Sequence, residues 1–137
     1  PRVLYVHGRP SANTTRKRCF EITKAVSNTF EVTRVPFEEL EARHLVGHDL
    51  IVIQRWASSA LEHVPEAFGL LARFRLFGKR FAYEIDDYIF HFGDDLPIDF
   101  MNVCDAVFVS TPKLGALASK HNPNVHVLRN AVDTERF

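Results

Sequence analysis

Two adjacent carboxylates, Asp86 and Asp87, are the sharpest chemical feature of this chain. Neighbouring carboxylates repel each other unless water, a hydrogen-bond donor or a cation relieves the repulsion. They directly follow a predicted strand, residues 80–85, so they would lie at its carboxyl end. There they could accept hydrogen bonds from a sugar hydroxyl, or one of them could act as a general base. A solvated turn or a helix cap is the structural alternative.

A divalent cation is a second way to relieve this repulsion, because hard cations prefer carboxylate ligands. The side chains that could hold it are Asp86, Asp87, His91 and Asp94. Acidic doublets without a fixed loop spacing are weak metal motifs. We therefore predict no metal here and assign Asp86 as the candidate catalytic residue.

Other apolar runs also end in polar residues. If the strands are parallel, their carboxyl ends meet at one edge of the sheet, where ligands bind in such folds. The candidate substrate-binding residues are Gly8, Arg9, Gln54, Arg55, Asp87, Ser110 and Thr111, together with Arg16 and Arg18 from the basic segment after the first strand. The basic segment could meet a phosphate or an anionic acceptor. The alternatives are strand ends that simply reach water and a solvated helix face.

The elements that must position these residues alternate along the chain. Strands are predicted at residues 3–6, 30–35, 50–53, 80–85, 106–109 and 125–128. Helical patterns separate them, the clearest at residues 65–77 with Gly78 as its C-terminal cap. This alternation predicts an α/β, Rossmann-like, doubly wound and mostly parallel six-stranded sheet with helices on both faces. We predict the strand order 3-2-1-4-5-6, and no dinucleotide cofactor, because a G-x-G-x-x-G fingerprint is absent.

Composition excludes several classes of protein. The chain has 137 residues, which suits one domain, and a formal net charge of zero, which disfavours nucleic acid as a partner. Its two cysteines lack a metal-type spacing, so a reduced, cytoplasmic protein is the simplest interpretation. No apolar run reaches the ~18 residues that a transmembrane helix needs, although peripheral membrane contact stays open.

Four phrases in order resemble one branch of GT-B, GT4-like glycosyltransferases. Residues 51–55 resemble V-x-L-Q-R, and residues 79–90 resemble Y-D-x-D-D-L-x-F. Residues 104–114 are similar to A-D-x-V-x-V-x-S-x-x-L, and residues 130–137 are similar to the N-G-V-D-x-x-x-F linker between the two domains. Together they span nearly the whole chain. This chain departs from the pattern at Ala131, which replaces a linker glycine, and at Asp86, where many relatives carry the histidine of an H-D pair.

The resemblance implies a function. Residues 1–129 would form the acceptor-side domain of a glycosyltransferase, and residues 130–137 would begin the linker to a C-terminal domain that is missing here. The nucleotide-sugar donor would bind mainly that missing domain, no cofactor is implied, and the acceptor would be a sugar, glycan or lipid. This chain alone would then be inactive.

Two other functions compete with the enzyme. One is a stand-alone, non-catalytic binding or regulatory module of the same fold. The other is a receiver-type signalling domain, which also uses an acidic pair. In that class the pair follows the first strand, whereas Asp86 and Asp87 follow the fourth predicted strand.

Overall fold

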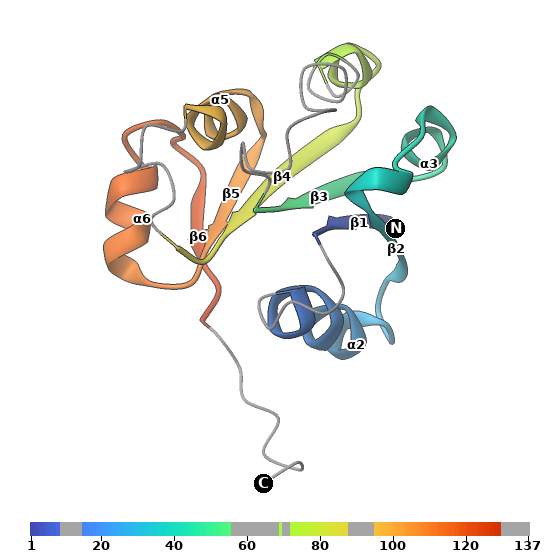
Figure 1. The fold of residues 1–137 in the computed structure, drawn as a ribbon, viewed down its shortest axis with the longest axis horizontal. Helices are drawn as coiled ribbons and strands as arrows, with labels where there is room; N and C mark the ends of the chain where they lie inside the picture. Colours follow the sequence, from blue (N-terminus) through green and yellow to red (C-terminus); the bar gives the residue numbers. More distant parts are fainter. Residues whose placement is uncertain (9–14, 56–68, 70–71, 88–94, 130–137) are drawn as a thin grey trace, which may run out of the picture.

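A six-stranded, all-parallel sheet forms the centre of the protein (Figure 1). The computed structural model describes residues 1–8, 15–55, 69, 72–87 and 95–129. The strands are β1 (Arg2–His7), β2 (Glu31–Pro36), β3 (Leu50–Gln54), β4 (Arg80–Ile85), β5 (Ala106–Val109) and β6 (Val125–Val127). Each begins and ends within one residue of its predicted range, so the α/β class is confirmed.

The strand order differs from the prediction. The strands lie in the order β2-β1-β3-β4-β5-β6, so the predicted order, with strand three at the edge, is wrong. The four residues Ile51 to Gln54 of β3 are buried, as in a central strand, whereas only Val35 of β2 is buried. Pro36 also suits an edge, because proline cannot donate to a neighbouring strand. The chain reverses direction across the sheet between β1 and β3, which places the ligand crevice of such folds there.

Short helices connect the strands. They are η1 (Arg16–Glu21, a π-helix), α2 (Ile22–Val26), η2 (Phe37–Glu39, a 3₁₀-helix), α3 (Ala42–Val46), α5 (Leu96–Val103) and α6 (Pro112–Ala118). Residues 72–76 are also helical, and Gly78 follows them with a φ of +76°. The left-handed backbone confirms Gly78 as the predicted cap, because glycine adopts it without a Cβ penalty. The predicted helical residues 65–68 lie outside the described part of the chain.

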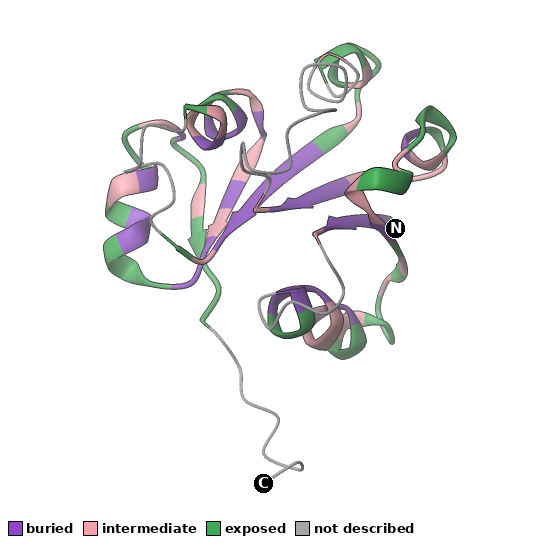
Figure 2. Ribbon diagram, viewed as in Figure 1, coloured by how far each residue is buried: buried purple, intermediate pink, exposed green. Residues whose placement is uncertain are grey.

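Two cores cover the two faces of the sheet, as Figure 2 shows by the burial of β1, β3 and β4. The larger core lies under α3, α5 and α6, which contribute Leu45, Phe100 and Leu114. The smaller core lies under η1, which contributes Cys19. In Figure 1, α2 lies on one side of the sheet and α3 and α5 lie on the other. Helices on both faces are therefore confirmed.

Candidate functional site

The end of β4 carries the acidic doublet. Asp86 directly follows β4 and its side chain is 14% exposed, whereas that of Asp87 is 56% exposed. The Ser110 hydroxyl at the end of β5 donates a hydrogen bond to the Asp86 carbonyl oxygen over 3.0 Å. Burial raises the pKa of the Asp86 carboxyl, and the neighbouring Asp87 charge raises it further, while Arg55 and Arg18 oppose the shift. Asp86 is thus a partly buried carboxyl group that binds its proton more tightly than an exposed aspartate does.

Arg55 brings the end of β3 to this doublet. Its Nη1 lies 2.9 Å from Asp87 Oδ2 and 3.9 Å from Asp86 Oδ1. The guanidinium is therefore the cation that relieves the repulsion between the two carboxylates. The Arg55 backbone has a φ of +37°, which is uncommon for a residue with a Cβ, and its N–H donates to the Glu84 carbonyl oxygen over 2.7 Å. Strained backbone of this kind collects at functional sites, and here it lies beside the switch point of the sheet.

A pocket of about 460 Å³ opens next to the doublet. It is lined by Asp86, Asp87, Thr111, Lys113, Leu114 and Leu117. Thr111 caps α6, because its Oγ1 accepts a hydrogen bond from the Leu114 N–H over 3.2 Å. The volume falls within the usual range for small-molecule sites. One wall therefore offers hydrogen-bond acceptors, and the α6 wall offers apolar surface and an ammonium group.

A buried ion pair lies beneath this edge, on the face that η1 covers. Arg18 Nε donates to Glu84 Oε1, and both side chains are only 1% exposed. Arg18 Nη1 also donates to the Leu128 carbonyl oxygen over 2.6 Å, and the Tyr5 hydroxyl donates to the Arg18 carbonyl oxygen over 2.8 Å. Burial raises the pKa of Glu84 to about 7, against the opposing charge of Arg18. The pair therefore ties η1 to the ends of β4 and β6.

The remaining predicted residues divide by position. Gln54 and Ser110 are at strand ends but buried, and Arg16 is exposed on η1. Gly8 follows β1 without a positive φ, and a Cβ there would only meet ordinary contacts, 3.7 Å from Thr15 Oγ1 and 3.9 Å from Phe37 Cε2. Arg9, His91 and Asp94 lie outside the described residues. The substrate-binding roles of all these residues stay predictions.

The structure places Arg55, Asp86, Asp87 and Thr111, four of the predicted site residues, at the doublet or its pocket. The sequence analysis did not single out Glu84 or Lys113, which lie beside them. A signal for Glu84 existed, because it stands between Tyr83 and Ile85 in a strand that is otherwise apolar after its first residue. A charged residue in a buried strand requires a partner, and Arg18 is that partner. Lys113 had no such signal, since only the packing of α6 directs it to the pocket.

Comparisons with protein-family models, with curated proteins and with solved structures give no match to this chain. Among the described residues, no group of three or more His, Cys, Asp or Glu side chains could hold a metal ion. None of the helices in the described ranges is long and apolar enough to cross a membrane. The chain is thus a Rossmann-like α/β domain with an all-parallel, six-stranded sheet.

Proposed function

We propose that this chain is the acceptor-side domain of a glycosyltransferase, which moves a sugar from a nucleotide-sugar to a glycan, lipid or other acceptor. One observation carries the proposal: Arg55, Asp86 and Asp87 meet beside a pocket of about 460 Å³ at the carboxyl edge of the sheet. These three residues belong to the phrases, residues 51–55 and 79–90, that resemble GT4-like enzymes. The proposal thus joins a sequence resemblance to a spatial arrangement.

The pocket suits a hydroxylated acceptor. Glycosyl transfer requires an acceptor hydroxyl to lose its proton as its oxygen attacks the anomeric carbon of the donor, while the bond from that carbon to the phosphate oxygen breaks and the nucleotide leaves. Asp86 can take that proton, because burial and Asp87 raise the pKa of the Asp86 carboxyl towards the working pH of a base. Arg55 orients the doublet, and Leu117 offers apolar surface to one side of a sugar ring.

The donor has a separate place in this proposal. The resemblance assigns the nucleotide-sugar mainly to a second domain, which would close over the carboxyl edge.

Cys19 and Cys104 are both free and buried, which fits the reducing cytoplasm, where we place the reaction.

A transfer assay on the natural full-length protein tests the role of Asp86. With UDP-, GDP- and dTDP-sugars as donors, Asp86→Asn should lower turnover by about 100-fold while leaving the fold intact. The matched control is Asp95→Asn, since Asp95 is exposed and makes no capping hydrogen bond at the start of α5. Unchanged turnover in Asp86→Asn would confine the doublet to a structural role.

A calorimetric titration of this chain alone separates the enzyme from the binding module. We expect negligible heat with each nucleotide-sugar. Micromolar binding, about −8 kcal/mol, would show that this domain holds the donor itself and would contradict the assignment of the acceptor side. A full-length protein that binds glycans but transfers no sugar would favour the non-catalytic module.

A further inference from the structure

Three apolar side chains project into water at the amino edge of the sheet, opposite the pocket. Leu76 is 87% exposed, Phe77 is 79% exposed and Val46 is 61% exposed. Val46 ends α3 shortly before β3, and Leu76 and Phe77 end the helix before β4. We name these three residues the amino-edge patch. Single exposed apolar residues are normal, but adjacent ones with nearly full exposure need a partner.

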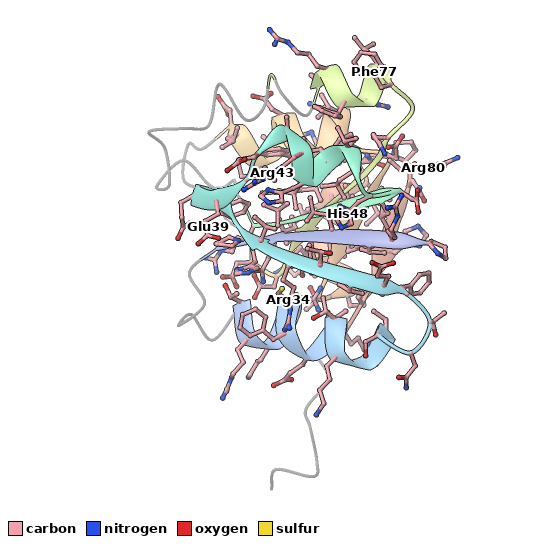
Figure 3. The ribbon with its side chains drawn as sticks, turned by 90° about the vertical axis from the view of Figure 1, so that its right-hand side faces the viewer. Arg34, Glu39, Arg43, His48, Phe77 and Arg80 are labelled. Atoms are coloured by element: carbon pink, nitrogen blue, oxygen red, sulfur yellow. The ribbon has the colours of Figure 1, made fainter. Side chains whose placement is uncertain are left out.

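Lys79 links the two helix ends that carry the patch. Lys79 Nζ donates hydrogen bonds to the Val46 carbonyl oxygen over 2.8 Å and to the His48 carbonyl oxygen over 2.7 Å. The end of α3 is therefore held against the segment that follows Phe77. Figure 3 shows Phe77, His48 and Arg80 from these neighbouring segments on the same side of the molecule.

Basic residues surround the patch. Arg73 and Arg80 are exposed, and Lys79 donates hydrogen bonds to two carbonyl oxygens. Arg75 is partly neutralised, since its Nη2 lies 3.8 Å from Asp105 Oδ1.

Among the described residues, Asp49 is a second acidic group near the patch, and its carboxylate accepts a hydrogen bond from the backbone N–H of Arg2 over 2.8 Å. In the described part of the chain, basic side chains thus outnumber acidic ones around the patch, although the whole chain has a formal net charge of zero.

We propose that the amino-edge patch docks this domain on an anionic lipid bilayer. Leu76 and Phe77 would enter the boundary between headgroups and acyl chains, and Arg73, Lys79 and Arg80 would meet lipid phosphates. Apolar insertion combined with basic flanks is the recognised basis of interfacial membrane binding.

The shape of the patch favours lipid over a protein partner. Its side chains lie at two helix ends and are 61% to 87% exposed, as expected of a protrusion rather than a groove. A stable protein interface buries about 800 Å² on each partner and matches a protrusion with a hollow. A fluid bilayer accepts a small protrusion without such a match. The pocket lies at the opposite edge, so this proposal does not rest on the glycosyltransferase function.

Vesicle co-sedimentation tests the proposal on this chain. We expect binding to phosphatidylcholine vesicles that contain phosphatidylglycerol, little binding to phosphatidylcholine alone, and weaker binding as salt screens the basic residues. The double variant Leu76→Ser/Phe77→Ser should lower the affinity by about tenfold or more. Arg73→Glu and Arg80→Glu should each lower it by about fivefold.

Two matched variants serve as controls. Leu128→Ser replaces an exposed leucine beyond β6 whose carbonyl oxygen alone contacts Arg18, and Lys24→Glu reverses an exposed charge on α2. Both should bind anionic vesicles like the unmodified chain. The proposal is overturned if the unmodified chain ignores anionic vesicles, or if the Leu76→Ser/Phe77→Ser variant binds them equally well. Self-association that disappears in that variant, without vesicle binding, would identify a second copy as the partner instead.

Discussion

The two faces of the sheet are built on opposite principles, and alternate residues of β4 show the difference. Phe81, Tyr83 and Ile85 point into the larger core, which consists of apolar side chains from most of the elements. Between them, Ala82 joins the smaller core and Glu84 holds the buried Arg18. One face thus holds the larger apolar core, while the other adds a buried ion pair to a smaller apolar core.

The difference separates stability from orientation. Apolar burial contributes roughly 25 cal/mol per Å², so the larger core supplies most of the stabilising free energy. A buried ion pair loses much of its electrostatic gain to desolvation, and an apolar replacement is often as stable. The Arg18–Glu84 pair nevertheless connects η1, β4 and the end of β6. Glu84 precedes Asp86 by two residues in the chain, so the pair lies close to the doublet. We infer that it orients the carboxyl edge rather than stabilising the fold.

Removing one partner of the pair should have the largest effect. Glu84→Ala leaves the Arg18 guanidinium buried without its carboxylate, which should lower the free energy of unfolding by about 3–5 kcal/mol. Urea denaturation above the Glu84 pKa of about 7, where both partners of the pair are charged, measures the change. Glu31→Ala, at an exposed position of β2, is the control and should stay within about 0.5 kcal/mol of the unmodified chain. If Glu84→Ala lowers the free energy of unfolding by less than about 1 kcal/mol, the Arg18–Glu84 pair is not a buried ion pair that excludes water.

Truncating the apolar face should cost slightly less and leave the site alone. Leu45 is fully buried in the larger core, so Leu45→Ala should cost about 2–5 kcal/mol. Val46→Ala, one residue on and exposed, should change stability by less than about 0.5 kcal/mol. Denaturation curves and amide spectra of the Asp86–Asp87 region test this together. A large spectral change at the doublet in Leu45→Ala would show that the two faces are not independent.

The pair should also make stability depend on pH. The pKa of Glu84 rises from 4.5 to about 7 in the folded chain, chiefly through burial. Between these values the folded state holds a proton that the unfolded state has released, so stability should fall as pH rises from about 4.5 to about 7, by roughly 1–3 kcal/mol. The raised pKa of Asp86 acts in the same direction, from the lower pKa of an unfolded aspartate upwards. Denaturation of Glu84→Gln across this range should show a flatter profile, and an unchanged slope would mean that other groups cause it.

The smallest effects concern backbone with positive φ. Gly78→Ala places a Cβ at a φ of +76° and should destabilise the fold by about 1 kcal/mol. Arg55→Gly relieves the strain at a φ of +37° and loses an exposed ion pair, so its stability should stay within about 1 kcal/mol. The pKa of Asp86 should rise in Arg55→Gly, because the guanidinium that lowers it is gone. Carboxyl NMR titration measures that pKa, and a fall would contradict the proposed role of Arg55.

Local sequence patterns predicted the strands of the fold. The features that these patterns did not predict, the order of the strands and the pairing of side chains across them, depend on long-range packing. Apolar runs marked the buried strands and an alternating pattern marked residues 30–35, while Gly78 marked a helix end. The edge position of β2 was missed, although its exposed Glu31 and Arg34 were a signal for it. Polar strand ends indicated the doublet and its neighbours, but nothing local showed that Arg55 would pair with Asp87.

The basic segment illustrates the same limit on one helix. Arg16 and Arg18 were grouped as a single basic surface, yet Arg16 is exposed and Arg18 is buried. Successive helical residues point in directions about 100° apart, so charges that are close in sequence can lie on different faces. Only the position of Glu84 on β4 determines which of these arginines turns inward.

The most direct test replaces the whole pair. Arg18→Met/Glu84→Leu removes both charges, and its free energy of unfolding can be measured beside carboxyl and amide NMR of Asp86, Asp87 and Thr111. If the pair orients the carboxyl edge without net stabilisation, the free energy of unfolding should stay within about 1 kcal/mol of that of the unmodified chain, or exceed it. The pKa of Asp86 should rise, and the resonances of the carboxyl edge should shift. A variant as unstable as Glu84→Ala, with the carboxyl edge unchanged, would contradict the account.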